Sequence, residues 1–87
     1  MSNKNEATLL LEGVLYLQQQ QTNKAITTLQ FLSKNPNALQ FGEAQWYLAL
    51  AYLQNKNTSE AKKILQTIVK EESDYYQQAN KLLQQLK

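Results

Sequence analysis

Hydrophobic residues recur at helical spacing in five successive segments of this chain. In the first segment, Leu10, Val14 and Leu17 lie three or four positions apart, which places them on one face of an α-helix. Polar stretches rich in Asn, Gln, Lys and Thr separate the segments. The pattern predicts a helix over residues 6–20, a second of about 12 residues that contains Ala25 to Leu32, and further helices over residues 38–54, 58–71 and from near 74 to 86.

Two of the separating stretches carry recognisable helix end signals. Pro36 lacks a backbone donor and disfavours the helical conformation at Asn35, so the second helix is expected to end before these residues. Asn57 is followed three residues later by Glu60, a spacing that resembles a capping box at the start of the fourth helix.

The helical segments repeat themselves at an offset of 36 residues. Tyr16-Leu17-Gln18 returns as Tyr52-Leu53-Gln54, and Leu29-Gln30 returns as Leu65-Gln66. A repeat of this length is typical of stacked helical hairpins, each burying its apolar face against the next. The offset also aligns three columns of apolar residues: Leu10, Trp46 and Leu82; Leu11, Tyr47 and Leu83; and Val14, Leu50 and Leu86.

The composition argues against several classes of function but does not identify one. The 87 residues suffice for one small domain, and 43% are hydrophobic, which favours a globular helical chain. All nine basic residues are lysines and the net charge is only +2, which argues against nucleic-acid binding. The chain contains no His, no Cys and no glycine-rich phosphate loop, so we expect no enzymatic activity, no metal and no cofactor.

No apolar run approaches the length of a membrane-spanning helix. Glu12 interrupts the run of leucines that precedes it, and Gln18 ends the next. The sequence therefore predicts a soluble chain that does not itself insert into a membrane.

The second repeat resembles the tetratricopeptide repeat, a helical hairpin of about 34 residues. The Leu, small and Tyr positions of the family motif in the first helix, and its small and apolar positions in the second, correspond to Leu48, Ala49, Tyr52, Ala61, Leu65 and Ile68. In the first repeat the corresponding residues are Gly13, Tyr16, Ala25, Leu29 and Leu32, whereas Glu12 replaces the motif's Leu. Trp46 lies one position after the motif's Trp, which Gln45 replaces, and the repeat is longer than usual.

The resemblance implies an all-α, right-handed solenoid. A single domain over residues 1–87 would contain one hairpin at about 5–35, a second at about 38–72, and a capping helix at about 74–86. The pattern around Trp46 is also similar to the C-terminal repeats of some membrane-anchored bacterial proteins, which would make the chain a cytoplasmic or periplasmic domain of such a protein.

Members of this family bind peptides on a concave face formed by the first helix of each repeat. Carried over position by position, that face would contain Ala7, Leu10, Val14, Leu17, Gln18, Glu43, Trp46, Leu50, Leu53, Gln54, Ala79, Leu82 and Leu86. Its apolar members Leu10, Val14, Leu17, Trp46, Leu50, Leu53 and Leu82 are the predicted protein-binding residues. They are unlike the Lys, Asn and Arg side chains that clamp a terminal carboxylate in other family members.

Two interpretations of the apolar columns stay open at this stage. In one, the columns pack on each other as core; in the other, they remain an open groove that binds a peptide or helix of a protein partner. A structural alternative is that the chain associates with itself or forms a segment of a larger repeat protein, because short solenoids leave apolar faces uncovered.

Overall fold

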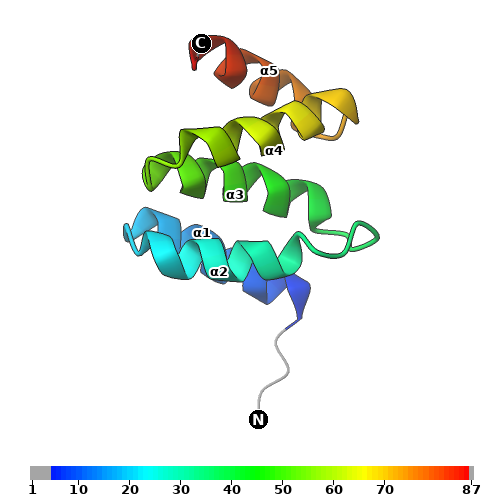
Figure 1. Ribbon diagram of the computed structural model, residues 1–87. Coiled ribbons are helices and arrows are strands. Elements are labelled where there is room, and N and C mark those ends of the chain that lie inside the picture. The colour runs from blue at the N-terminus through cyan, green and yellow to red at the C-terminus, as the bar shows by residue number, and fades with distance from the viewer. Residues whose placement is uncertain (1–4, 87) are drawn as a thin grey trace.

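Five helices, joined by short turns, stack in one direction. The computed structural model describes residues 5–86, in which the helices are α1 (Glu6–Gln18), α2 (Thr22–Leu32), α3 (Phe41–Gln54), α4 (Thr58–Lys70) and α5 (Tyr76–Gln85), with no strand. Helices α1 and α2 form one hairpin, α3 and α4 form the next, and α5 packs on α4 (Figure 1). The all-α fold and the five helices expected from the sequence are confirmed.

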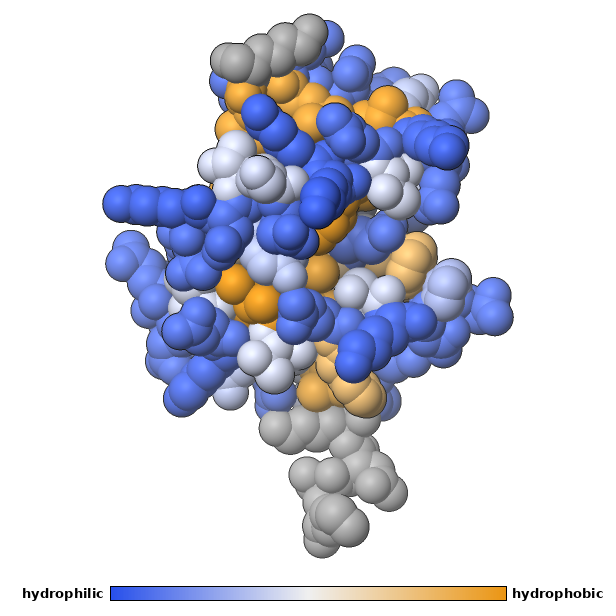
Figure 2. All heavy atoms as spheres, in the orientation of Figure 1, coloured by the Kyte–Doolittle hydropathy of each residue, from blue (hydrophilic) through white to orange (hydrophobic). Residues whose placement is uncertain are grey.

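Two apolar clusters hold the stack together. The first is centred on Ala25, Leu29, Leu48 and Ala51, so it joins the first hairpin to α3. The second is centred on Ala49, Leu65, Ile68 and Ala79, so it joins the second hairpin to α5. On the face of the molecule seen in Figure 2 the surface is largely hydrophilic, and hydrophobic residues appear on it in patches.

Small residues on α1 and α3 set the spacing within each hairpin. A Cβ atom added at Gly13 would lie 2.7 Å from Leu29 Cδ2 and 2.8 Å from its Cγ, so only glycine fits beside this buried leucine. The offset of 36 residues places Ala49 at the same position in the second hairpin, where it is fully buried.

Helices α1, α3 and α4 have the same type of C-terminal cap. After each helix a non-glycine residue adopts positive φ: Gln20 (60°), Lys56 (64°) and Glu72 (51°). At the C-terminus of α1, Gln20 N donates to Leu17 O at 3.0 Å and Gln21 N donates to Tyr16 O at 2.8 Å. This is the hydrogen bonding of a Schellman motif. Glycine usually occupies this left-handed position, so the non-glycine residue at each of these helix ends carries some backbone strain.

Several helix boundaries differ from those expected. Helix α3 begins at Phe41 rather than near Ala38, because Ala38 N donates to Asn35 O at 3.0 Å and Phe41 N donates to Ala38 O at 3.1 Å. These two bonds form successive tight turns that delay the helix. Helix α1 also ends at Gln18, before the expected residue 20, and α5 begins at Tyr76 rather than near 74.

The expected capping box at α4 is wrong. Asn57 is the N-cap residue, but its side chain does not cap the helix. Its Oδ1 instead accepts a hydrogen bond of 2.6 Å from Asn55 Nδ2, while Glu60 pairs with Lys63. The turn before α4 is thus stabilised within itself.

Candidate functional site: a groove across α1, α3 and α5

Two hollows lie side by side across α1 and α3, the first helices of the two hairpins, and α5. One has a volume of about 310 Å³ and is lined by Val14, Leu17, Gln18, Tyr47, Leu50 and Gln54 of α1 and α3. The other has a volume of about 300 Å³ and is lined by Trp46, Leu50, Gln78, Lys81, Leu82 and Gln85 of α3 and α5. Leu50 lines both, so the two hollows adjoin; we call them together the concave groove.

The groove combines apolar side chains with amides. Val14 and Leu50 are half-buried and belong to neither apolar cluster, so their exposed atoms face the groove without a core role. Four glutamines, Gln18, Gln54, Gln78 and Gln85, provide hydrogen-bonding groups beside them. Lys81 is the charged side chain among the lining residues.

Gln54 fixes one end of the groove. Its Nε2 donates to Leu17 O at 3.2 Å, and its Oε1 accepts a hydrogen bond from Thr22 Oγ1. These bonds connect the end of α3 to the last turn of α1 and to the first residue of α2. A side chain bound in this way holds the relative position of the helices that form the first hollow.

Trp46 is held at the other end by an aromatic stack. Its ring lies 5.4 Å from the ring of Tyr75, centroid to centroid, and the two planes differ by only 4°. Tyr75 immediately precedes α5, so the stack connects α3 to the start of that helix. Burial raises the pKa of the Tyr75 phenol above its usual value of 10.0, and the nearby Tyr47, Glu43 and Asp74 raise it further.

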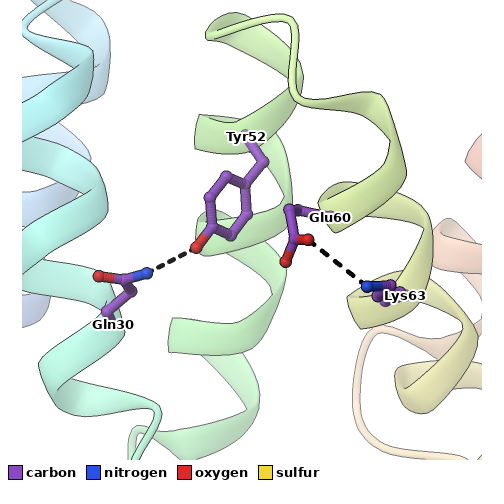
Figure 3. A network of polar contacts seen from close by, with 4 residues as sticks. All are labelled: Gln30, Tyr52, Glu60 and Lys63. Carbon is purple, nitrogen blue, oxygen red and sulfur yellow. Dashed lines mark hydrogen bonds and ion pairs between the residues drawn. The ribbon is translucent and has the colours of Figure 1, made fainter.

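A polar contact joins the two hairpins beside the second half of α3. Gln30 Nε2 of α2 donates to Tyr52 Oη of α3 at 2.6 Å (Figure 3). The ion pair between Lys63 Nζ and Glu60 Oε1, 3.5 Å apart, lies within α4 and is well exposed (Figure 3). Only the first of these two contacts connects the hairpins.

Comparison with family models now identifies the architecture. A tetratricopeptide repeat model matches residues 31–86, and a second tetratricopeptide repeat model matches residues 7–38. The chain belongs to the tetratricopeptide repeat family. Repeats of this family generally mediate protein–protein interaction and are typically non-catalytic. Neither a curated protein nor a solved structure matches the chain.

The seven predicted binding residues lie in four different environments of this tetratricopeptide repeat domain. Val14 and Leu50 line the groove and belong to neither apolar cluster. Leu17, Trp46 and Leu82 line the groove and also pack against an apolar cluster. Leu10 packs against the first cluster and lines neither hollow. Leu53 is half-buried and also lines neither hollow.

The column of Leu10, Trp46 and Leu82 is therefore divided between the two clusters. Leu10 packs on the first, whereas Trp46 and Leu82 pack on the second. Ala79, which the family pattern placed on the concave face, is fully buried in the second cluster, so that assignment is wrong.

Four lining residues were missing from the expected concave face: Tyr47, Gln78, Lys81 and Gln85. The last three lie on α5 at helical spacing around Leu82. Extending the helical period outward from Leu82 would have found Gln78 and Gln85, because residues three or four apart share a helix face. Lys81 would have followed, since it lies three residues after Gln78 and four before Gln85.

Among residues 5–86, no helix has the length and apolarity needed to cross a membrane. The same residues contain no group of three or more acidic, His or Cys side chains placed to hold a metal ion.

Proposed function

We propose that this tetratricopeptide repeat domain is a non-catalytic interaction module whose concave groove binds an apolar segment of a protein partner. The observation that carries the proposal is the meeting of the two hollows at Leu50. A bound helix or extended peptide would contact α1, α3 and α5 at once. Open apolar surface of this kind is a feature of protein interaction sites.

The lining indicates the chemistry of the bound segment. Apolar side chains would occupy the two hollows, because the half-buried Val14 and Leu50 offer no hydrogen bonds there. The glutamines beside them can donate to and accept from a peptide backbone. An acidic residue of the partner would best lie near Lys81, where it would gain a favourable charge interaction.

Trp46 provides a direct signal of occupancy. It is the only tryptophan of the chain, and it lines the second hollow. A segment that enters this hollow excludes water from the indole, which changes its fluorescence. Binding can therefore be measured without a label.

The test begins with short peptides selected from a displayed random library on the unmodified protein. Titration of each peptide against Trp46 fluorescence gives its affinity for the wild type, for Leu50→Gln and for Leu39→Gln. Leu39 is 92% exposed and lines neither hollow, so Leu39→Gln is the matched control.

We expect Leu50→Gln to weaken binding by about tenfold or more, because it places an amide at the point the two hollows share. Leu39→Gln should leave the affinity unchanged. Equal affinities for wild type and Leu50→Gln, or selection of purely polar peptides, would contradict the proposal.

A further inference from the structure

The ring of Trp46 rests on Tyr75, although Tyr75 itself does not line the concave groove. The two rings are nearly parallel, with 4° between their planes and 5.4 Å between their centroids. Trp46 lines the second hollow, whereas Tyr75 is half-buried, packs against the second apolar cluster and lines neither hollow. A segment bound in the groove would therefore contact Trp46 without contacting Tyr75.

Tyr75 is held in place through both its backbone and its side chain. Its carbonyl oxygen accepts a hydrogen bond of 2.8 Å from the backbone N of Ala79, which is fully buried. Burial raises the pKa of its phenol, and the nearby Tyr47 and Glu43 of α3 raise it further. The side chain thus lies between the second apolar cluster and the helix that carries Trp46, where it offers the indole a fixed surface.

The corresponding position of the first hairpin makes no such contact. The offset of 36 residues equates Tyr75 with Leu39 and Trp46 with Leu10. Leu39 is 92% exposed, and Leu10 packs against the first apolar cluster but lines neither hollow. The repeat therefore folds without a packed side chain at this position of the turn. The aromatic stack occurs where the equivalent helix residue lines the groove.

We propose that Tyr75 is a positioning residue of the concave groove, which holds the indole of Trp46 in the orientation that lines the second hollow before a partner binds. This inference rests on the proposed binding function of the groove. A half-buried side chain with several accessible rotamers loses that freedom when a partner packs on it, which weakens binding. Stacking on Tyr75 favours one orientation in the free protein. Tyr75 thus raises the affinity without touching the partner.

The first measurement needs no partner. Trp46 is the only tryptophan of the chain, so the decay of its fluorescence anisotropy reports the local motion of this one indole on the nanosecond timescale. Wild type and Tyr75→Phe, which keeps the ring, should show little local motion, whereas folded Tyr75→Leu should show a clear fast component. Tyr76→Leu is the matched control and should behave like wild type, because Tyr76 is 39% exposed and lines neither hollow.

The second measurement uses peptides selected on the wild-type protein, at a temperature where far-ultraviolet circular dichroism shows each variant to be folded. The midpoint of each Trp46 fluorescence titration, and not its amplitude, gives the affinity. Tyr75→Leu should bind about two- to tenfold more weakly, since ordering one further side chain on binding has an effect of that size. Tyr75→Phe and Tyr76→Leu should bind like wild type. A Tyr75 that only stabilised the fold would change Tm and leave affinity and anisotropy unchanged.

Failure of the positioning role is distinguishable from failure of the groove as a binding site. If no selected peptide binds the wild type, or if Leu50→Gln has no effect, the proposed function fails and this inference fails with it, whatever the anisotropy. If peptides bind the wild type and folded Tyr75→Leu equally, or if the indole is equally immobile in both, only the positioning role is overturned.

The proposal stays testable even if Tyr75→Leu does not fold. Wild type and Tyr75→Phe then decide it, because both keep the ring that supports Trp46. An immobile indole in both proteins together with equal affinity would support the proposal. A mobile indole in the free wild type, or weaker binding by folded Tyr75→Phe, would overturn it.

Discussion

The packing of Gly13 against Leu29 predicts that one glycine of this protein resists replacement by alanine while the other accepts it. Both Gly13 and Gly42 lie in helices, where alanine is favoured over glycine by about 0.5–1 kcal/mol on backbone entropy. Space alone distinguishes them. A Cβ at Gly42 has no neighbouring atom within 4 Å, but a Cβ at Gly13 would overlap Leu29.

The overlap at Gly13 should outweigh the gain in helix propensity. The added carbon would lie 2.8 Å from Leu29 Cγ, an atom that cannot turn aside without moving the whole fully buried side chain. Inserting a carbon into a packed core costs about 1–3 kcal/mol. We therefore expect Gly13→Ala to lower the free energy of unfolding by about 0.5–2 kcal/mol, and Gly42→Ala to raise it by about 0.5 kcal/mol.

Urea unfolding followed by far-ultraviolet circular dichroism measures both changes. For a domain of this size, a loss of 1 kcal/mol lowers Tm by about 4–8 °C, which makes the difference easy to resolve. Ala49→Gly provides the reciprocal test in the second hairpin, where it should also destabilise, by about 1–2 kcal/mol, because it removes a buried methyl group. If Gly13→Ala stabilised the protein as Gly42→Ala does, the argument from close packing would be refuted.

Three further predictions concern the turns, the polar contacts and the pH dependence. Lys56→Gly should stabilise the domain by about 0.5–1 kcal/mol in urea unfolding, since glycine adopts positive φ without strain; a loss of stability would contradict this origin of the strain. Tyr52→Phe should cost about 0.5–1 kcal/mol by removing one of the hydrogen bonds between the hairpins, whereas Glu60→Gln, in an exposed pair, should change stability by less than about 0.5 kcal/mol; equal effects would show that the contact between Gln30 and Tyr52 adds no more stability than an exposed ion pair. The raised pKa of Tyr75 means that its contribution to stability is fully present below pH 10.0 and is lost as the pH rises through its folded-state pKa. Tyr75→Phe should lose less stability than wild type in that alkaline range, and identical pH profiles would argue against the shift.

The helices were predictable from the sequence because their apolar period extends over several turns. The starts of α3 and α5 were less so, since they depend on short backbone bonds in the preceding loops. Ala38, for example, is a good helix former, but its N–H is bonded to Asn35 O in a turn. Nothing in the hydrophobic pattern carries that information.

The exposure of Leu11 was beyond the reach of the pattern for a different reason. The repeat correctly aligns Leu11 with Tyr47 and Leu83, and the latter two pack against the apolar clusters. Equivalent sequence positions have equivalent neighbours only where a helical layer lies on the same side. For the first hairpin of a stack the same periodicity instead marks an uncovered face.

Trp46 shows why the choice between core and groove could not be made from its residue type. It packs against the second cluster, stacks on Tyr75 and lines the second hollow, so both interpretations describe part of the same side chain. Trp46→Ala would therefore reduce stability and peptide binding together, and the two losses could not be separated. Leu50 lies on the same helix face, one turn later, and belongs to neither cluster, so a change there acts on the groove with least effect on the core. Leu50 is therefore better suited to test the groove than Trp46, although residue type alone would favour the tryptophan as the anchor.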